Sequence, residues 1–161
     1  MEDLKLLHIG CANRYYPGFI NSDMRTEWKG KKNKLDLVMD ISKPWPYEND
    51  SIDGIVSMHV LQQLYWRELI FGLREAYRVL KTGGVFRFGC PTVDVDGRSI
   101  DYILGWNNIN LFDSYLLKQV FSYHLGFSRF SETMFHVSAL PVLATIDNRE
   151  DRGTKYYEAI K

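Results

Sequence analysis

The chain is poor in cysteine, with only Cys11 and Cys90 among its 161 residues. Two cysteines so far apart make neither a disulfide framework nor a zinc-binding spacing, and no H-E-x-x-H motif is present. We therefore expect no bound metal. Both cysteines end apolar runs, where buried free thiols are common. Reduced thiols are typical of a cytoplasmic protein, which is the localisation we expect.

The chain also lacks an excess of charge of either sign and a long apolar run. Lysine and arginine together number 20, aspartate and glutamate together number 20, and the net charge is zero. This balance gives no general attraction to nucleic acid or to an acidic membrane surface. No apolar stretch approaches the ~20 residues of a membrane span. Residues 1–7 lack the basic and apolar parts of a targeting segment. We expect neither nucleic acid nor a membrane as a partner.

What the chain does have is the length and composition of one globular domain. Hydrophobic residues make up 45% and charged residues 25% of the sequence, which excludes a disordered chain and a collagen-like repeat. At this length, folding buries roughly 70% of the surface that the unfolded chain exposes. We therefore predict a single domain over residues 1–161.

Apolar runs and helical periodicity alternate along the chain. Short apolar runs closed by glycine, aspartate or proline predict strands, whereas apolar residues at three- and four-residue spacing predict helices. Predicted strands occupy residues 4–9, 19–23, 35–39, 52–58, 85–90, 127–135 and 156–160, and predicted helices occupy residues 62–80 and 111–125. We predict that residues 81–84 stop the first helix and that the basic segment 28–34 is a loop. This order predicts an α/β fold with helices on both faces of the sheet.

Candidate binding residues follow the predicted strands. In a parallel sheet, ligands bind beyond the carboxyl ends of the strands, where Gly10, Asp23 and Asp40 lie. Either carboxylate can accept hydrogen bonds from ribose hydroxyls or an adenine amino group; the alternative is an aspartate that stabilises its own turn. His59 is either a general base or substrate contact, or a residue that only packs at the start of the long helix. Nucleophile-elbow, P-loop and G-x-G-x-x-G motifs are absent.

Segments at and after the predicted strands carry a pattern that extends over nearly the whole chain. They are L-H-I-G-C at 7–11, P-G-F-I-N-S-D at 17–23, L-D-L-V-M-D at 35–40, W-P-Y-E-N-D-S-I-D-G-I at 45–55, H-V-L at 59–61 and L-R-E-A-Y-R-V-L-K-T-G-G at 73–84. The last segment is similar to the helix and R-V-L-K-P-G-G turn of the methyltransferase type 11 group. Together the segments resemble class I S-adenosylmethionine-dependent methyltransferases.

The resemblance implies a Rossmann-like sheet of seven strands, mostly parallel with an antiparallel last strand, and S-adenosylmethionine as the cofactor. By position, Gly10 and Cys11 would lie beside the methionine part of the cofactor. Asp23 would bind the ribose hydroxyls, and Asp40 with Ile41 would meet the adenine. The other implied positions are Met24 at the cofactor, Ser57 and Met58 beside the sulfonium, and His59 as the catalytic candidate.

Three residues depart from the family pattern. His8 stands where the family usually has an acid that helps to hold the methionine amino group, Ala12 replaces a glycine, and Gln63 replaces a histidine. The connection between Ile9 and Ile20 is only ten residues long, which is short for a crossover helix. We therefore predict a shortened first crossover, and a cofactor affinity of roughly tens of micromolar or weaker.

These observations predict an enzyme that transfers a methyl group from S-adenosylmethionine to a small-molecule or glycan-type acceptor. We expect residues 91–110 and Tyr65–Trp66 to form the acceptor site. A sulfonium methyl group is already activated, so the enzyme needs alignment and exclusion of water more than a catalytic triad. Two alternatives stay open. One is a non-catalytic binding or scaffold protein with a degenerate cofactor site, favoured by His8 and Ala12; the other is a different nucleotide-binding α/β enzyme.

Overall fold

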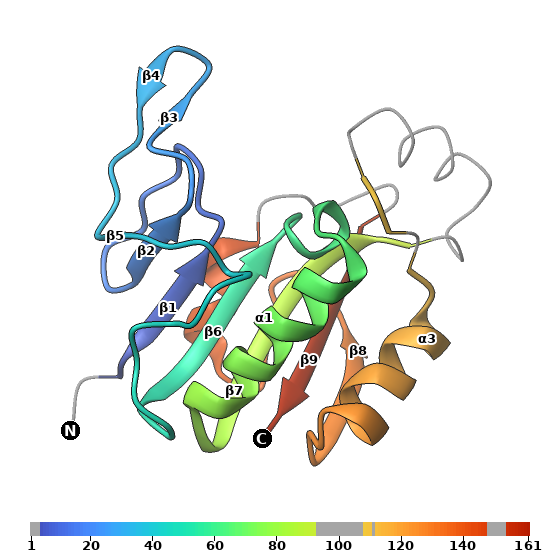
Figure 1. Ribbon diagram of the computed structural model, residues 1–161. Coiled ribbons are helices and arrows are strands. Elements are labelled where there is room, and N and C mark those ends of the chain that lie inside the picture. Colours follow the sequence, from blue (N-terminus) through green and yellow to red (C-terminus); the bar gives the residue numbers. More distant parts are fainter. Residues whose placement is uncertain (1–3, 93–107, 111, 148–153) are drawn as a thin grey trace.

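The computed structural model describes residues 4–92, 108–110, 112–147 and 154–161. Its centre is a seven-stranded sheet in the order β5-β2-β1-β6-β7-β9-β8 (Figure 1). The strands are β1 Leu6–Ile9, β2 Ile20–Asp23, β5 Leu37–Val38, β6 Ile52–Met58, β7 Leu80–Pro91, β8 Arg129–Thr133 and β9 Thr154–Ile160. The pairs from β5 through β7 are parallel, whereas β9 runs antiparallel to both of its neighbours. The predicted Rossmann-like sheet with an antiparallel last strand is confirmed.

Each predicted strand overlaps an observed strand, but β7 begins at Leu80 rather than at Val85, and β9 begins at Thr154 rather than at Tyr156. Leu80 already pairs with Ile52, and the next pair in the ladder is Gly54 with Val85. Residues 81–84, predicted to stop the helix, therefore form an irregularity within β7. One of the glycines there takes a φ of +79°. Because glycine suits a helix end and a strand bulge equally well, the sequence pattern did not separate the two.

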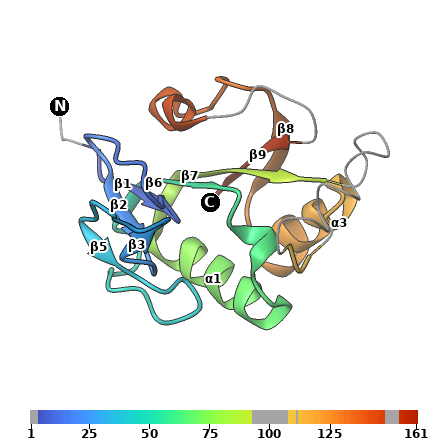
Figure 2. The ribbon, with the colours of Figure 1, turned by 90° about the horizontal axis from the view of Figure 1, so that it is seen from above.

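Helices cover one face of the sheet (Figure 2). The predicted helix at 62–80 consists of a 3-10 turn, η1 Leu61–Gln63, and of α1 Trp66–Val79. The two are separate because Leu64 and Tyr65 have extended backbone angles. The buried face of α1 consists of Leu69, Gly72, Leu73, Ala76 and Val79, at the spacing of one helix side.

The second predicted helix, at 111–125, is observed as α3 Ser114–Lys118 followed by a π-helical stretch, η2 Gln119–His124. Asp113 begins it as a capping residue, because its carboxylate accepts a hydrogen bond from the backbone N–H of Leu116 at 2.7 Å. Among the described residues, none of the helices combines the length and the apolar character that crossing a membrane requires.

The opposite face of the sheet carries much less helix. Within the described part of the chain, a single 3-10 helix, η3 Pro141–Ile146, packs on it, and it is seen in orange above the sheet in Figure 2. Leu143 and Ile146 of η3 are fully buried against this face. Residues 10–19, which connect β1 to β2, form turns without a helix. The predicted shortened first crossover is therefore confirmed.

The connection from β2 to β5 contains a small hairpin instead of the predicted loop at 28–34. β3 Glu27–Trp28 pairs with β4 Lys31–Lys32, and Lys29 and Gly30 form the turn with φ angles of +51° and +74°. Two successive left-handed residues are typical of a tight hairpin turn, in which asparagine or glycine is favoured. Lysine at the first turn position gives no such signal, so the sequence did not predict the hairpin. Figure 1 shows the hairpin rising beyond the carboxyl ends of the parallel strands.

A buried arginine holds the segment that contains η3 against this face of the sheet. Arg87 on β7 is fully buried, and its guanidinium binds Asp147, which follows η3, through two hydrogen bonds. It also binds Glu158 on β9 at 3.1 Å and donates to the carbonyl oxygens of Val137 and Met134 at 2.6 and 3.0 Å. A buried charge is tolerated only when it is paired and hydrogen-bonded. This network therefore fixes residues 134–147 to the sheet.

We predict that Arg87→Met destabilises the protein by about 3–5 kcal/mol, because it leaves two buried carboxylates without their cation. The matched control is Lys81→Met. Lys81 forms an ion pair with Asp53 at 2.7 Å, but its side chain is 44% exposed, so we expect a loss of about 1 kcal/mol or less. Urea unfolding of the three proteins measures both effects. Equal losses for the two variants would contradict this role of Arg87.

Candidate functional site

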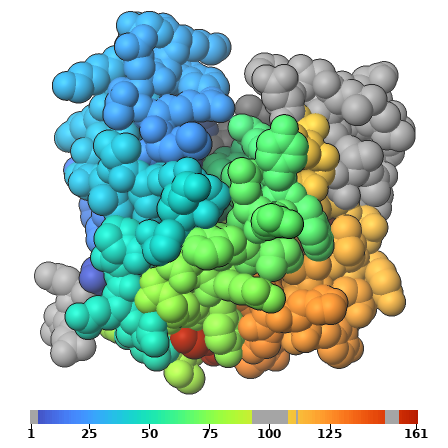
Figure 3. Space-filling model, in the orientation of Figure 1, coloured from blue at the N-terminus to red at the C-terminus, as the bar shows by residue number. Residues whose placement is uncertain are grey.

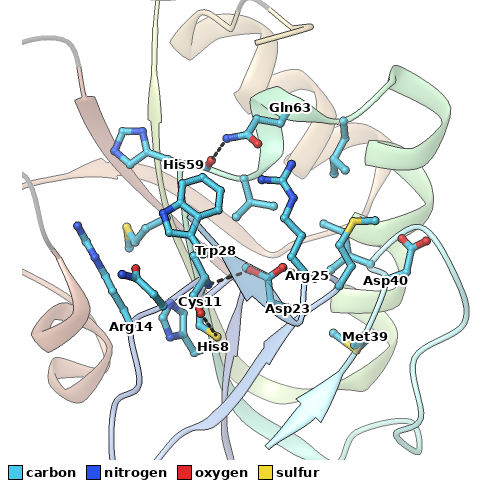
Figure 4. A pocket seen from close by; sticks show the side chains of 18 of the residues that line it. His8, Cys11, Arg14, Asp23, Arg25, Trp28, Met39, Asp40, His59 and Gln63 are labelled. Atoms are coloured by element: carbon cyan, nitrogen blue, oxygen red, sulfur yellow. Dashed lines mark hydrogen bonds between the residues drawn. The ribbon is translucent and has the colours of Figure 1, made fainter. Parts of the chain in front are cut away.

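A cavity of about 440 Å³ lies at the carboxyl ends of β1, β2, β5 and β6, beside the β3–β4 hairpin and η1 (Figures 3 and 4). Its lining includes eight of the expected site residues: Gly10, Cys11, Asp23, Met24, Asp40, Ile41, Met58 and His59. The parallel register explains this convergence. Ile9 pairs with Ser22 on one side and with Ser57 on the other, so the residues that follow these three positions lie side by side.

Two expected parts of the site do not line the cavity. Ser57 precedes Met58 on β6, and successive side chains of a strand point to opposite faces; Ser57 is fully buried and does not line the cavity. Tyr65 and Trp66, expected at the acceptor site, are exposed and are absent from the cavity wall. Residues 93–107, which form most of the other expected acceptor segment, lie outside the described residues.

Asp23 joins three segments at the floor of the cavity. One carboxylate oxygen accepts a hydrogen bond from the backbone N–H of Ala12, and the other accepts one from that of Arg25, both at 2.8 Å. The residue is only 9% exposed. Because a carboxylate has about four lone-pair sites, both oxygens keep the capacity to accept hydrogen bonds from a diol.

The backbone after β1 is held in a conformation that brings it close to its neighbours. Gly10 has a φ of +68°, and a Cβ at this position would lie 2.2 Å from Cγ2 of Val60, so a side chain there would displace Val60. Ala12, which departs from the family's glycine, takes a φ of +50°. This left-handed conformation costs about 1–2 kcal/mol in a residue with a Cβ. The hydrogen bond from Ala12 to Asp23 offsets that cost, and the alanine keeps a glycine-like backbone.

Asp40 presents a carboxylate on the opposite side of the floor. One of its oxygens accepts hydrogen bonds from the hydroxyl and the backbone N–H of Ser42, at 2.7 and 2.9 Å. These hydrogen bonds lower the pKa of the Asp40 carboxyl, so the group is ionised at neutral pH. Its second oxygen has no hydrogen-bond partner among the described residues and is available to a donor such as an adenine amino group.

His8 is a buried, neutral imidazole at the end of the cavity nearest β1. The side-chain amide nitrogen of Asn21 donates to the carbonyl oxygens of Tyr16 and Phe19 and to the carboxylate of Asp36, at 2.8–3.1 Å. The amide oxygen therefore faces Nδ1 of His8, 3.3 Å away. This assigns the proton to Nδ1 and leaves Nε2 as a hydrogen-bond acceptor. Burial lowers the pKa of His8 to about 4, so the imidazole stays neutral at pH 7.

His59 follows β6 in a left-handed conformation with a φ of +60°. Its backbone N–H donates to the carbonyl oxygen of Gly89, and its own carbonyl oxygen accepts from the side chain of Gln63, both at 2.8 Å. Nε2 of the imidazole lies 3.3 Å from the hydroxyl oxygen of Thr154 on β9. Gln63, the third departure from the family pattern, thus supports the backbone of His59 at the cavity wall (Figure 4).

Sequence reasoning did not assign the cationic and aromatic part of the cavity wall to the site. Arg14, Arg25, Trp28 and Lys29 all line the cavity. The basic segment that contains the last two resembled a solvated loop, because its lysines follow neither a strand nor a helix period. The one available signal was position, since Arg14 and Arg25 each follow a predicted strand by a few residues.

Comparison with known proteins identifies the family. A family model described as a methyltransferase domain matches residues 5–88, which is more than half of the chain. The chain belongs to the methyltransferase domain family. It is a methyltransferase whose cofactor is S-adenosylmethionine. No curated protein sequence matches the chain.

Solved structures share the fold of this methyltransferase. An S-adenosylmethionine-dependent methyltransferase from Archaeoglobus fulgidus is 19% identical with a TM-score of 0.69, and the match covers 99% of this chain and 87% of that one. A methyltransferase from Thermotoga maritima is 18% identical with a TM-score of 0.67, over 100% and 84% of the two chains. One from Methanosarcina mazei is 13% identical with a TM-score of 0.66, over 100% and 93%. At these identities the likeness describes the fold alone.

The residues of the cavity fit this cofactor chemically. Two carboxylates, Asp23 and Asp40, stand at the ends of neighbouring strands, and one oxygen of Asp40 lacks a partner within the described chain. At the β1 end, Gly10 lets the backbone approach Val60 more closely than a residue with a Cβ would. The cofactor carries hydroxyl and amino donors at one end and an amino-acid group at the other, which matches carboxylates at one end of the cavity and His8 at the other.

We predict that His8 makes the protein less stable as the pH falls from about 6.5 to about 4. The unfolded chain binds a proton on His8 below pH 6.5, whereas the folded protein does so only near pH 4, so acid favours unfolding. The contribution reaches about 1.4 kcal/mol per pH unit within this window. His8→Asn keeps a donor toward Asn21 but does not titrate, so its unfolding free energy should depend less on pH. Urea unfolding at several pH values measures the difference.

The control for this prediction is His124→Asn, since His124 is exposed at the end of η2. Its curve of unfolding free energy against pH should remain parallel to that of the wild type. A His8→Asn curve that also runs parallel to the wild type would show that His8 is not a buried neutral group.

Proposed function

We propose that this protein transfers the methyl group of S-adenosylmethionine to a small-molecule or glycan-type acceptor, as one catalytic domain over residues 1–161. The observation that carries the proposal is the pair of carboxylates, Asp23 and Asp40, on the floor of one cavity at the carboxyl ends of parallel strands. The balanced charge and the buried free cysteines support a cytoplasmic enzyme with a small acceptor.

The proposal assigns one group of the cofactor to each polar residue of the cavity. Asp23 accepts from the ribose hydroxyls, and the unpartnered oxygen of Asp40 accepts from the adenine amino group. Nε2 of His8 accepts from the ammonium group in place of the family's acid. Arg14, whose charge acts on His8 and which lies at the same end of the cavity in Figure 4, balances the carboxylate. Ile41 and Met24 supply apolar surface beside the adenine.

The rest of the chemistry requires positioning. The bound cofactor supplies an activated methyl group, and the reaction needs the nucleophile, the methyl carbon and the sulfur in line with water excluded. Met58 and Val60 supply apolar surface next to the expected position of the sulfonium. His59 lies between them in the chain, and it is the titratable side chain that could accept a proton from a hydroxyl or amine acceptor.

The rival function, a scaffold that has lost its cofactor, rested on His8 and Ala12. The backbone angle of Ala12 is the one that a glycine would supply. His8 offers a neutral acceptor rather than a positive charge at the ammonium position. Both observations favour a working cofactor site over a degenerate one. A neutral acceptor makes a weaker hydrogen bond to an ammonium group than a carboxylate does, which agrees with the modest affinity that we expect.

We predict that Asp40→Asn weakens the binding of S-adenosylmethionine about tenfold or more, because an amide N–H₂ would then face the adenine amino group. The fold should survive, since asparagine keeps the oxygen that binds Ser42. Isothermal calorimetry with a parallel melting curve measures both quantities. Asp50→Asn is the control, because the Asp50 side chain is exposed and pairs with Lys161 outside the cavity. Failure of the wild type to bind the cofactor would overturn the proposed function.

A second variant, His59→Asn, separates a catalytic from a structural role of this histidine. Asparagine adopts the left-handed conformation readily, so the substitution removes the imidazole without adding backbone strain. If His59 is a general base, turnover on an accepted substrate falls roughly 100-fold or more while the melting temperature and the cofactor affinity stay unchanged. We expect the smaller, structural effect, since alignment can drive methyl transfer alone. A large loss of turnover in a fully stable variant would contradict this expectation.

A further inference from the structure

We propose that Arg25, Trp28 and Lys29, here called the basic wall, bind an anionic group of the methyl acceptor, either a phosphate or a carboxylate. This inference rests on the proposed function, because it assigns a class of acceptor to the same cavity. The three residues belong to one short segment, which runs from the connection after β2 into the β3–β4 hairpin, and all of them line the cavity.

The hairpin holds the basic wall in a defined geometry. Asn33 is buried and links the two strands at the base of the hairpin. Its backbone N–H donates to the carbonyl oxygen of Thr26 at 2.8 Å, and its side-chain amide donates to the carbonyl oxygen of Arg25 at 2.7 Å. The guanidinium of Arg25 lies over the indole of Trp28, 5.5 Å from the ring centre, a cation–π contact that orders the arginine. Lys29 is fixed in the left-handed turn position at the tip.

Cofactor binding uses neither Arg25 nor Lys29, as a comparison of the charged residues in the cavity with the polar groups of the cofactor indicates. The lining holds three cations, Arg14, Arg25 and Lys29, and two carboxylates. Within the described part of the chain, none of the three cations forms an ion pair, although the protein as a whole is neutral. The assignments above use both carboxylates, His8 and Arg14 for the four polar parts of the cofactor. Arg25 and Lys29 remain, and the cofactor has no second anionic group for them.

The orientation of Arg25 points to the acceptor side of the cavity. In Figure 4 its side chain rises from the floor, away from Asp23, toward Gln63. The amide of Gln63 binds the backbone of His59, at the end of the cavity where we expect the methyl group. An anion held by Arg25 would therefore lie near the transfer site, and the exposed side of Trp28 could pack against the body of the same molecule.

The chemistry of the basic wall selects against neutral and cationic acceptors. A guanidinium presents parallel N–H donors that match the oxygens of a phosphate or a carboxylate, and a lysine adds a point charge. The positive sulfonium of the bound cofactor reinforces the attraction for an anion. A cationic acceptor would meet like charges from both the wall and the cofactor.

The test uses the full chain saturated with S-adenosylhomocysteine, so that the cofactor's own groups are already bound. Pyrophosphate, malonate and glucose are titrated as phosphate, carboxylate and neutral probes. We expect pyrophosphate or malonate to bind with a dissociation constant of about 1 mM or lower, weakened by added salt, and glucose not to bind. The tighter of the two anions identifies the source of the anionic group.

Variants that each remove one positive charge from this segment distinguish a specific anion-binding site from a diffuse electrostatic attraction. Arg25→Gln and Lys29→Gln should each weaken the binding of the anion about fivefold or more, whereas Lys31→Gln and Lys32→Gln, which remove exposed charges outside the cavity lining, should change it less than about twofold. Equal losses in all four variants would overturn the proposal in favour of diffuse attraction.

Three further outcomes also overturn the proposal, and they are distinguishable from one another. Displacement of S-adenosylhomocysteine by pyrophosphate would assign the cations to the cofactor's carboxylate instead of to the acceptor. Absence of S-adenosylhomocysteine binding to the wild type would overturn the proposed function itself. Cofactor binding without any anion binding would overturn the basic wall alone.

Discussion

The cavity depends on the carboxylate of Asp23. This carboxylate accepts one hydrogen bond from the backbone N–H of Ala12, in the β1–β2 connection, and one from that of Arg25, in the segment that leads to the hairpin. Ten residues between two parallel strands leave no room for a crossover helix, so the backbone donors at this turn need another acceptor. Asp23 provides it and still has lone pairs for a ligand. The group that shapes the floor is thus the group expected to bind the ribose.

A second network of buried carboxylates stabilises the face of the sheet opposite to α1. The sheet has α1 and the α3–η2 segment on one face but only η3 among the described elements of the other. Arg87, held by Asp147 and Glu158, fixes the η3 segment there. The full set of partners around the arginine compensates for the loss of its water. A small protein thereby covers a sheet face with a single turn-rich segment instead of the usual helices.

The acidic and basic residues of the cavity lie in different parts of its wall, although the net charge of the chain is zero. The acids, Asp23 and Asp40, lie on the floor at the strand ends, whereas the cations lie in the turns and the hairpin that follow those strands. A cofactor with hydroxyl and amino donors suits the floor, and an anionic acceptor suits the wall. The division follows from topology: short polar side chains at strand ends reach only the floor, and long basic side chains from the hairpin reach over it.

The sequence by itself determined the strands, the long helix and the acids at the strand ends, because these depend on local patterns and on the parallel order of the sheet. The same patterns carried the family resemblance and the shortened crossover. Only the tertiary structure decided which face Ser57 occupies, since a slip of one residue reverses the side of a strand. It also decided the hairpin at Lys29 and the partners of Arg87, because pairing in space leaves no trace in residue spacing. The tertiary structure also decided that His8 is neutral. Burial beside Asn21, which no local pattern predicts, removes water from the imidazole and disfavours its protonated, charged form.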